Sequence, residues 1–299
     1  MFDEWRRRWR RLILGAAPAA RLEAHIASAA RRDEDVERVL SALREENARL
    51  WRSLAGLAAQ VDRFKSSLQV DPALHEELRL WKASHPIPER PLVSVCVATY
   101  DRKEILLSRC IPSVLAQTYA HLELIVVGDG CTDGTPEAVG RIADPRLRFV
   151  NLPQRGRYPG DPERRWMVAG TAPINHALSM ARGDWVTHLD DDDEYLPERL
   201  ETLVAFAREH ACDVVWHPFH AEDEQGTWTV NEAREFAWTM VTTSSVFYRS
   251  WFTRILWDPE AHRLLEPGDW NRFRRIQYLD PVARRCPLPL LRHHRERRL

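Results

Sequence analysis

Four consecutive carboxylates, Asp190-Asp191-Asp192-Asp193, are the residues of this sequence with the clearest chemical potential. They directly follow residues 184–189, an apolar stretch typical of a buried strand. Four carboxylates cannot all stay ionised at close range without a compensating cation. A divalent ion with oxygen ligands is the natural partner, and such an ion can also bridge a diphosphate. We therefore predict a metal site with Mn²⁺ or Mg²⁺ as cofactor, in preference to a solvated acidic loop.

Polar residues also follow two other predicted strands. Tyr100 and Asp101 come after the strand 92–98, and Asp129 comes after the strand 122–127. A further strand is expected at 147–150, and helical patterns lie between the strands, at 105–117, 135–142 and 174–181. This alternation predicts an α/β fold with a doubly wound, mostly parallel sheet. In such folds ligands bind beyond the carboxyl ends of the strands, so three acidic strand ends should converge on one crevice.

Two common nucleotide-binding motifs are absent from the sequence. No glycine-rich GxGxxG follows the first strand, and no GxxxxGK[ST] occurs anywhere. Their absence argues against a dinucleotide-dependent oxidoreductase and against a P-loop NTPase.

Composition and charge narrow the class of protein further. The 299 residues carry a net charge of −1, which argues against a nucleic-acid-binding surface. That charge is uneven, because residues 1–32 and 283–299 each carry +5. A hydrophobic content of 44% supports a real core, and no uninterrupted apolar stretch is long enough to span a bilayer. Five scattered cysteines without CxxC spacing read as reduced packing residues of a cytosolic protein.

Residues 1–32 form a predicted basic amphipathic helical segment. Trp5, Trp9 and Leu12 recur at helical spacing, and arginines fill the other face. This pattern suits a helix lying on an anionic membrane surface. The alternative is a helix that docks its tryptophans on protein.

Residues 33–70 carry a heptad pattern typical of a coiled coil, with Asn47 at an a position. A buried asparagine pairs best with its own copy in register, so we expect a homodimer or a higher homo-oligomer. A long helix packed on its own domain is the alternative. Pro72 and the later prolines predict that the helical region ends and that residues 71–90 form a linker.

From residue 91 onward, four ordered segments resemble the nucleotide-sugar-binding half of the family 2 glycosyltransferases. The segments are 93–101, 113–119, 123–135 and 181–193, the last closed by Leu196-Pro197. The resemblance covers roughly 91–295 and implies a GT-A domain over 91–299, with a nucleotide-sugar-binding half (91–195) and an acceptor half (196–299).

The family pattern, carried over by position, implies the roles of the strand-end residues. It places the nucleotide base near Ala98, Thr99, Tyr100 and Asp129. Asp190 and Asp192 match the metal-binding DxD motif, with Asp192 as the direct ligand and Asp191 near the ribose. Arg164, in the arginine-bearing loop 154–169, fits best the arginine that some relatives place against the nucleotide. Loop capping is the alternative role for the strand-end acids.

In the acceptor half, the segment 266–270 resembles the acidic motif that supplies the catalytic base. Asp269 would take the proton of the acceptor hydroxyl. Glu266 is the alternative base, and an N-cap on a helix 270–276 is the alternative role of Asp269. The resemblance also implies a C-terminal histidine that reaches the metal or the diphosphate, for which we take His294, with His293 or a solvated tail as alternatives.

The sequence departs from the family pattern in three places, which affect the expected identity of the donor more than the expected type of reaction. Gly128 stands where the family usually has an acid, and Asp101 stands where it usually has an asparagine. The loop 154–169 is longer than usual and contains four arginines.

The resemblance thus implies a metal-dependent, inverting glycosyltransferase. The expected donor is a nucleotide-diphospho-sugar, UDP favoured over GDP or TDP, and the acceptor is a hydroxyl of a glycan or a lipid-linked molecule in polysaccharide or glycoconjugate synthesis. We expect a cytoplasmic protein, with peripheral contact to the inner face of the cell membrane as a further expectation. The competing interpretation is a catalytically silent assembly protein that binds nucleotide and uses its coiled coil as a scaffold.

Overall fold

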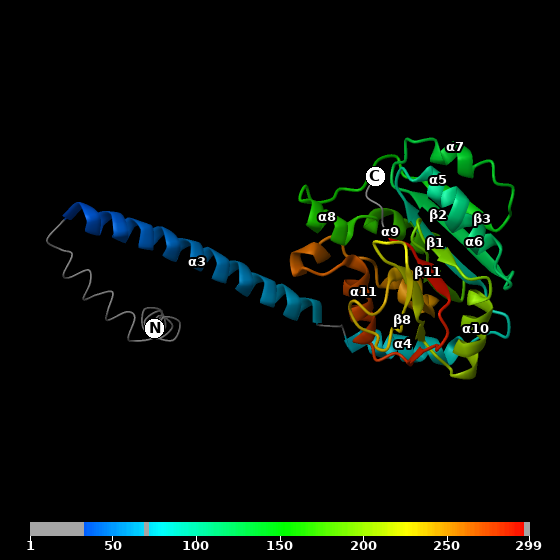
Figure 1. Ribbon diagram of the computed structural model, residues 1–299. Coiled ribbons are helices and arrows are strands. Elements are labelled where there is room, and N and C mark those ends of the chain that lie inside the picture. Colours follow the sequence, from blue (N-terminus) through cyan, green and yellow to red (C-terminus); the bar gives the residue numbers. More distant parts are fainter. Residues whose placement is uncertain (1–32, 69–71, 296–299) are drawn as a thin grey trace. The chain divides into compact units, whose positions relative to one another are not determined.

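The computed structural model describes residues 33–68 and 72–295 (Figure 1). The chain divides into two compact units, Met1–Arg63 and Phe64–Leu299. The predicted amphipathic segment 1–32 lies outside the described residues. Among the described residues, none of the helices combines the length and apolar character needed to cross a membrane.

The described residues of the first unit form one long helix, α3 (Asp33–Leu68), whose last residues belong to the second unit. Its predicted heptad seam is solvent-exposed: Leu50 and Leu57 are each 57% exposed, and Val61 is 45% exposed. A helix is therefore present where the coiled coil was predicted. Pairing with a second copy stays a prediction.

The predicted linker 71–90 requires a correction, because most of it is a helix, α4 (Pro72–Ser84). Proline is tolerated in the first turn of a helix, so Pro72 begins a helix and does not merely end one. Leu78 is only 5% exposed and belongs to a core cluster of the second unit. Lys82 Nζ lies 2.6 Å from the buried carboxylate of Asp213, and Arg254 pairs with Glu77.

The second unit is built on a seven-stranded, mostly parallel sheet in the order β10-β6-β9-β4-β1-β2-β3. β1, β2, β3 and β4 are mutually parallel, β6 pairs parallel with β10, and β9 runs antiparallel between β4 and β6. The strands are β1 (Val93–Thr99), β2 (Leu122–Gly128), β3 (Leu147–Asn151), β4 (Trp185–His188), β6 (Val214–Trp216), β9 (Val246–Arg249) and β10 (Ala283–Arg285). The predicted α/β fold with a mostly parallel sheet is confirmed.

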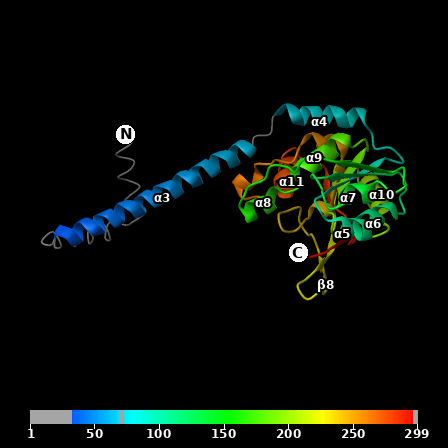
Figure 2. The same ribbon diagram turned by 90° about the horizontal axis from the view of Figure 1, so that it is seen from above.

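Helices cover both faces of this sheet, because side chains of its buried strands alternate between two cores (Figures 1 and 2). Val95 and Val97 face one core, which α6 and α10 close, and Cys96 faces the other, which α9 and α11 close. The helices are α5 (Lys103–Ile105), a π-helical turn η1 (Leu106–Cys110), α6 (Ile111–Leu115), α7 (Thr135–Val139), α8 (Pro162–Val168), α9 (Thr171–Met180), α10 (Arg199–Glu209) and α11 (Gly268–Gln277). The 3₁₀ turns are η2 (Thr243–Ser245), η3 (Ser250–Arg254) and η4 (Ala261–Leu264).

A second, four-stranded sheet brings the end of the chain back to the acidic run. Its order is β5-β11-β7-β8, with β5 (Glu194–Tyr195), β7 (Phe219–Glu222), β8 (Trp228–Asn231) and β11 (Leu291–His293). β5 begins directly after the four aspartates, and β11 pairs with it. The five cysteines are all free and buried, as expected of packing residues.

Candidate active site

A cavity of about 850 Å³ opens beyond the carboxyl ends of β1, β2 and β4, where the sequence predicted a crevice. It brings together residues from distant parts of the chain. Its lining includes Ala98, Thr99, Tyr100, Asp129, Asp190, Asp191 and Asp192 from the strand ends, Asp269 from α11, and His293 and His294 from the end of the chain.

Arginines hold the acidic run at the edge of this cavity. The Arg102 Nη1 lies 2.7 Å from Asp192 Oδ2 and 3.3 Å from Asp191 Oδ1. Arg109, from the π-helical turn η1, donates to the backbone carbonyl of Asp192. Burial raises the pKa of Asp191 to about 6, although Arg102 acts in the opposite direction. Arg102 thus provides a positive charge for the two middle carboxylates of the run.

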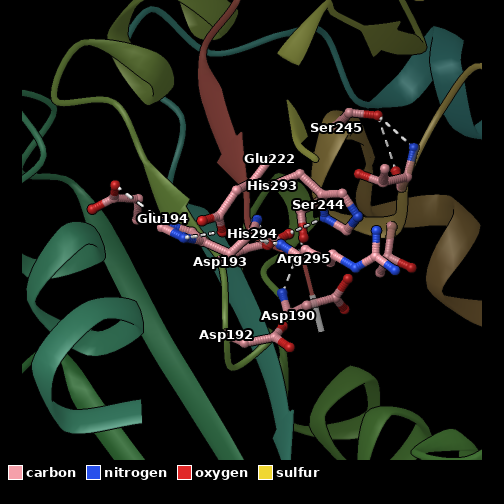
Figure 3. Close-up of polar contacts among 12 residues, drawn as sticks. Asp190, Asp192, Asp193, Glu194, Glu222, Ser244, Ser245, His293, His294 and Arg295 are labelled. Carbon is pink, nitrogen blue, oxygen red and sulfur yellow. Dashed lines mark hydrogen bonds and ion pairs between the residues drawn. The ribbon is translucent and has the colours of Figure 1, made fainter. Parts of the chain in front are cut away.

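Asp193 points away from the predicted metal ligands and anchors the returning strand β11 (Figure 3). Its carboxylate is fully buried and accepts hydrogen bonds from His293 Nδ1 and from the backbone N–H of His294, both at 2.9 Å. Burial lowers the pKa of His293, but the hydrogen bond to Asp193 and the nearby carboxylates outweigh it and raise the pKa to about 9. These contacts favour the protonated form of the His293 imidazole.

The assignment of His294 to the metal site is corrected by the structure. Its Nδ1 and Nε2 each lie 3.4 Å from a carboxylate oxygen, of Glu222 and Glu194 respectively (Figure 3). The imidazole therefore faces the second sheet. His294 follows the last residue of β11, His293, and it is the His293 side chain that meets Asp193.

Asp190 and Asp192 supply the hard oxygen atoms that Mn²⁺ or Mg²⁺ prefers. Asp190 is positioned by its backbone N–H, which donates to Ser244 Oγ at 3.0 Å. Burial and the carboxylates of Asp193 and Asp192 raise the pKa of Asp190 well above its usual range. This donor set fits a divalent cation, which would offset the crowding of negative charge.

A tighter set of potential ligand atoms lies elsewhere in the described part of the chain, at Asp101, Cys131 and Asp133, within 4.8 Å of one another. The predicted ligands Asp190, Asp192 and His294 do not form a group this tight. The carboxylates of Asp101 and Asp133 accept hydrogen bonds from the backbone N–H groups of Thr132 and Lys103. They are therefore part of the loop's own hydrogen bonding.

The same cavity lining carries the residues predicted to bind the nucleotide base. Asp129 is 2% exposed, and its two oxygens accept hydrogen bonds from Gly156 N–H and from the Tyr158 hydroxyl, at 2.8 and 2.7 Å. The guanidinium of Arg155 lies 3.6 Å from the centre of the Tyr100 ring. Asp129 thus organises the loop 154–158 and still lines the cavity.

The assignment of Arg164 to the nucleotide is also corrected. Arg164 is exposed on α8 and lies outside the lining of the cavity. Its backbone N–H meets the side chain of Asp161, which caps this helix. Arg155, nine residues earlier in the same loop, lies in the cavity wall in its place.

The unusual Gly128 has a local steric explanation. A Cβ at this position would lie 2.4 Å from Asn151 Oδ1. That same oxygen accepts the Cys131 N–H at 2.9 Å, and Asn151 Nδ2 donates to the Cys131 carbonyl. Asn151 therefore braces the loop after β2 in the space that an acidic side chain would need.

The two candidate bases, Asp269 and Glu266, differ in their surroundings. Asp269 lines the cavity and accepts a hydrogen bond from Thr243 Oγ1 at 3.2 Å. Burial raises its pKa above the usual range, although the Trp270 N–H and Thr243 act in the opposite direction. Pro267, and not Asp269, is the N-cap of α11. Glu266 is buried outside the cavity lining and pairs with Arg274. The geometry therefore favours Asp269.

Sequence reasoning missed Arg102, Arg155 and the pairing of Asp193 with His293. Arg102 stands four residues after the end of the predicted strand 92–98, a spacing that could have suggested contact with a neighbouring strand end. The pairing of Asp193 with His293 joins residues 100 positions apart and has no local signal.

The chain matches the model of the family described as glycosyl transferase family 2 over residues 94–160 and 163–261, more than half of its length. The chain belongs to this family. The resemblance to the family 2 glycosyltransferases seen in the sequence is thereby confirmed.

Curated relatives match part of the chain. The succinoglycan biosynthesis protein ExoO of Rhizobium meliloti is 36% identical over 118 residues, covering 40% of this chain and 30% of the relative. The putative colanic acid biosynthesis glycosyl transferase WcaA of Escherichia coli is 30% identical over 132 residues, covering 43% of this chain and 41% of the relative. These alignments thus span less than half of each curated relative.

Solved structures share the fold. S. aureus TarS 1–349 in complex with UDP-GlcNAc superposes with a TM-score of 0.54 at 21% identity, covering 69% of this chain and 59% of that one. The mannosyltransferase PcManGT from Pyrobaculum calidifontis, in complex with GDP-Man and Mn²⁺, gives a TM-score of 0.51 at 20% identity, covering 80% and 68%. At this identity the likeness concerns the fold.

Proposed function

We propose that this protein is a metal-dependent, inverting glycosyltransferase. It transfers a hexosyl group from a nucleotide-diphospho-sugar, with a UDP-sugar as the favoured donor. The acceptor is a hydroxyl group of a glycan or a lipid-linked molecule in polysaccharide or glycoconjugate synthesis. The observation that carries the proposal is the single cavity that contains both the acidic strand end of β4 and the carboxylate of Asp269. The matched relatives named for polysaccharide biosynthesis support the acceptor class.

The chemistry needs one base and one stabilised leaving group. Asp269 accepts the proton of the acceptor hydroxyl while that oxygen forms its bond to the anomeric carbon. The bond between the anomeric carbon and the diphosphate breaks in the same displacement, and the nucleoside diphosphate leaves with the bonding electron pair. Attack from the side opposite the leaving group inverts the anomeric centre.

Asp190 and Asp192 would hold the Mn²⁺ or Mg²⁺ ion. When bound, this ion supplies positive charge to the leaving diphosphate. Tyr100, Asp129 and Arg155 form the wall at the ends of β1 and β2, where we place the nucleotide. His293, whose protonated form is favoured by Asp193 and the nearby carboxylates, would add positive charge beside the same acidic run.

Donor binding and donor turnover test the function separately. We expect UDP-GlcNAc, or another nucleotide sugar of a screened panel, to raise the melting temperature only with Mn²⁺ or Mg²⁺, because a ligand of the folded state stabilises it by mass action. We expect the same donor to be hydrolysed or transferred. If a donor binds but is never hydrolysed or transferred, the catalytically silent assembly protein is favoured instead. If no donor binds, both the glycosyltransferase and the nucleotide-binding assembly protein are overturned.

We also propose that α3 pairs with a second copy as a parallel coiled coil. Its exposed seam of Leu50, Leu54, Leu57 and Val61 supports this interface, since a contiguous apolar stripe of this kind marks an interaction surface. Asn47 lies on the same seam, which favours a parallel, in-register partner.

A further inference from the structure

Two tryptophans of the cavity wall are unusually exposed. Trp166 on α8 is 61% exposed, and Trp238, between β8 and η2, is 49% exposed. Both line the cavity that contains Asp269. Large aromatic side chains usually bury most of their surface, so two exposed indoles in one cavity indicate a ligand with an apolar face.

The segments that carry these tryptophans both contact the element that carries the base. On one side, the backbone of Met167, the residue after Trp166, packs against the start of α11: a Cβ on Gly268 would lie 3.2 Å from the Met167 carbonyl oxygen. On the other side, Thr243, five residues after Trp238, donates to Asp269 at 3.2 Å. The indoles are therefore carried by segments that contact α11 and Asp269.

The rest of the lining near Asp269 mixes apolar side chains, such as Val241 and Phe273, with uncharged polar ones. Asn231, Thr239 and Thr242 line the cavity together with Trp238. A pyranose ring has an apolar face of C–H groups, which stacks on an indole, and an edge of hydroxyl groups, which hydrogen-bonds to amides and hydroxyls. A hydrocarbon chain would use the indoles but leave these amide and hydroxyl groups unsatisfied.

From this combination we infer that Trp166 and Trp238 form an acceptor subsite that binds the pyranose rings of a glycan. The inference rests on the proposed function, because it takes the wall around Asp269 as the acceptor side. It narrows the acceptor to a carbohydrate chain whose sugar rings, and not a lipid portion, are recognised.

The test measures glycan binding by the full chain, with α-1,4-linked and β-1,4-linked glucose tetrasaccharides as probes. In saturation-transfer NMR we expect signal on the ring C–H protons of at least one probe. Trp166→Ala and Trp238→Ala should each weaken that binding about tenfold or more, and the Phe variants should retain most of it, because a phenyl ring still stacks. Leu288→Ala is the matched control, since Leu288 is 51% exposed but lies outside the cavity lining.

Donor binding separates this inference from the proposed function. The tryptophan variants should bind the donor and Mn²⁺ like the wild type, measured by thermal shift. Absence of glycan binding, or equal binding by the Ala variants, would overturn the subsite and leave donor binding intact. Failure of donor binding in the wild type would overturn the proposed function instead. A third outcome, in which the Ala variants lose binding to phosphatidylglycerol vesicles but keep glycan binding, would show a lipid-binding surface and would also overturn the subsite.

Discussion

Glu266 accepts two hydrogen bonds from Arg274, one on each carboxylate oxygen, at 2.8 and 2.7 Å. Three residues later, Asp269 faces the cavity. The two acids on neighbouring turns of the chain therefore have different surroundings, one paired inside the protein and the other available to a substrate.

This difference predicts opposite phenotypes for two conservative substitutions. Asp269→Asn should lower kcat by about 10²- to 10⁴-fold, because it removes the base, while the melting temperature changes little. Glu266→Gln should lower the free energy of unfolding by about 1–3 kcal/mol, because it weakens a buried charge-assisted pair, while the residual folded enzyme stays active. Steady-state kinetics and urea unfolding of both variants check this. Full activity in Asp269→Asn would refute the assignment of the base.

The raised pKa of Asp269 predicts the acid limb of the pH–rate profile. The base acts only when it is deprotonated, so kcat should fall as the pH is lowered through a value above the usual range of an aspartate. Donor binding is measured across the same pH range as a control for titration of the acidic run. A limb at the ordinary aspartate value would contradict the prediction.

The buried His217 predicts a loss of stability in mild acid. Its Nε2 accepts a hydrogen bond from the fully buried Arg199, and its Nδ1 donates to the Pro218 carbonyl, so the ring is held neutral. Burial and Arg199 lower the pKa of His217 well below 6.5. The unfolded chain therefore binds a proton first, and stability should fall below pH 6.5 by up to about 1.4 kcal/mol per pH unit. Urea unfolding should show a shallower pH slope for His217→Gln, and an unchanged slope would disprove the prediction.

Two glycines in the loop after β2 predict different costs for the same substitution. Gly130 and Gly134 have φ of +71° and +83°, so alanine strains the backbone at both positions. At Gly130 a Cβ would also lie 2.5 Å from the Arg155 backbone nitrogen, whereas at Gly134 the nearest atom is 3.9 Å away. Gly134→Ala should cost about 1 kcal/mol, and Gly130→Ala should cost more and also weaken donor binding. Equal donor affinity in the two variants would argue against the role of the Arg155 loop.

The exposed seam of α3 predicts a change of oligomeric state. Leu50→Glu combined with Leu57→Glu should convert a dimer into a monomer, because charges at these d positions cannot be buried against a second copy. Light scattering on a sizing column measures the mass. Arg52→Glu, at an exposed position off the seam, is the control and should stay dimeric. A wild-type monomer at all concentrations would exclude the coiled coil.

Where the sequence succeeded, the signal was local. The apolar runs of β1, β2 and β4, each followed by acidic residues, predicted a parallel sheet with a crevice at the strand ends, where the cavity lies. Hydrophobic patterning and strand-end polarity are readable within a few residues. Pro72 shows the limit of local rules, since the same residue can follow one helix and begin the next. Only the contacts of Leu78 and Lys82 with the second unit distinguish α4 from a linker.

The contacts of the residues around the acidic run could be determined only from the tertiary structure. Asp193 accepts from the side chain of His293 but only from the backbone N–H of His294, and the register of β11 beside β5 places both histidines there. Arg155 rather than Arg164 lies in the cavity because the loop 154–158 folds onto Asp129. The sequence alone therefore determined the family, the central sheet and the identity of the acidic strand end. The choice among neighbouring histidines, arginines and acids was made by long-range packing, because orientation and burial depend on segments up to a hundred residues apart.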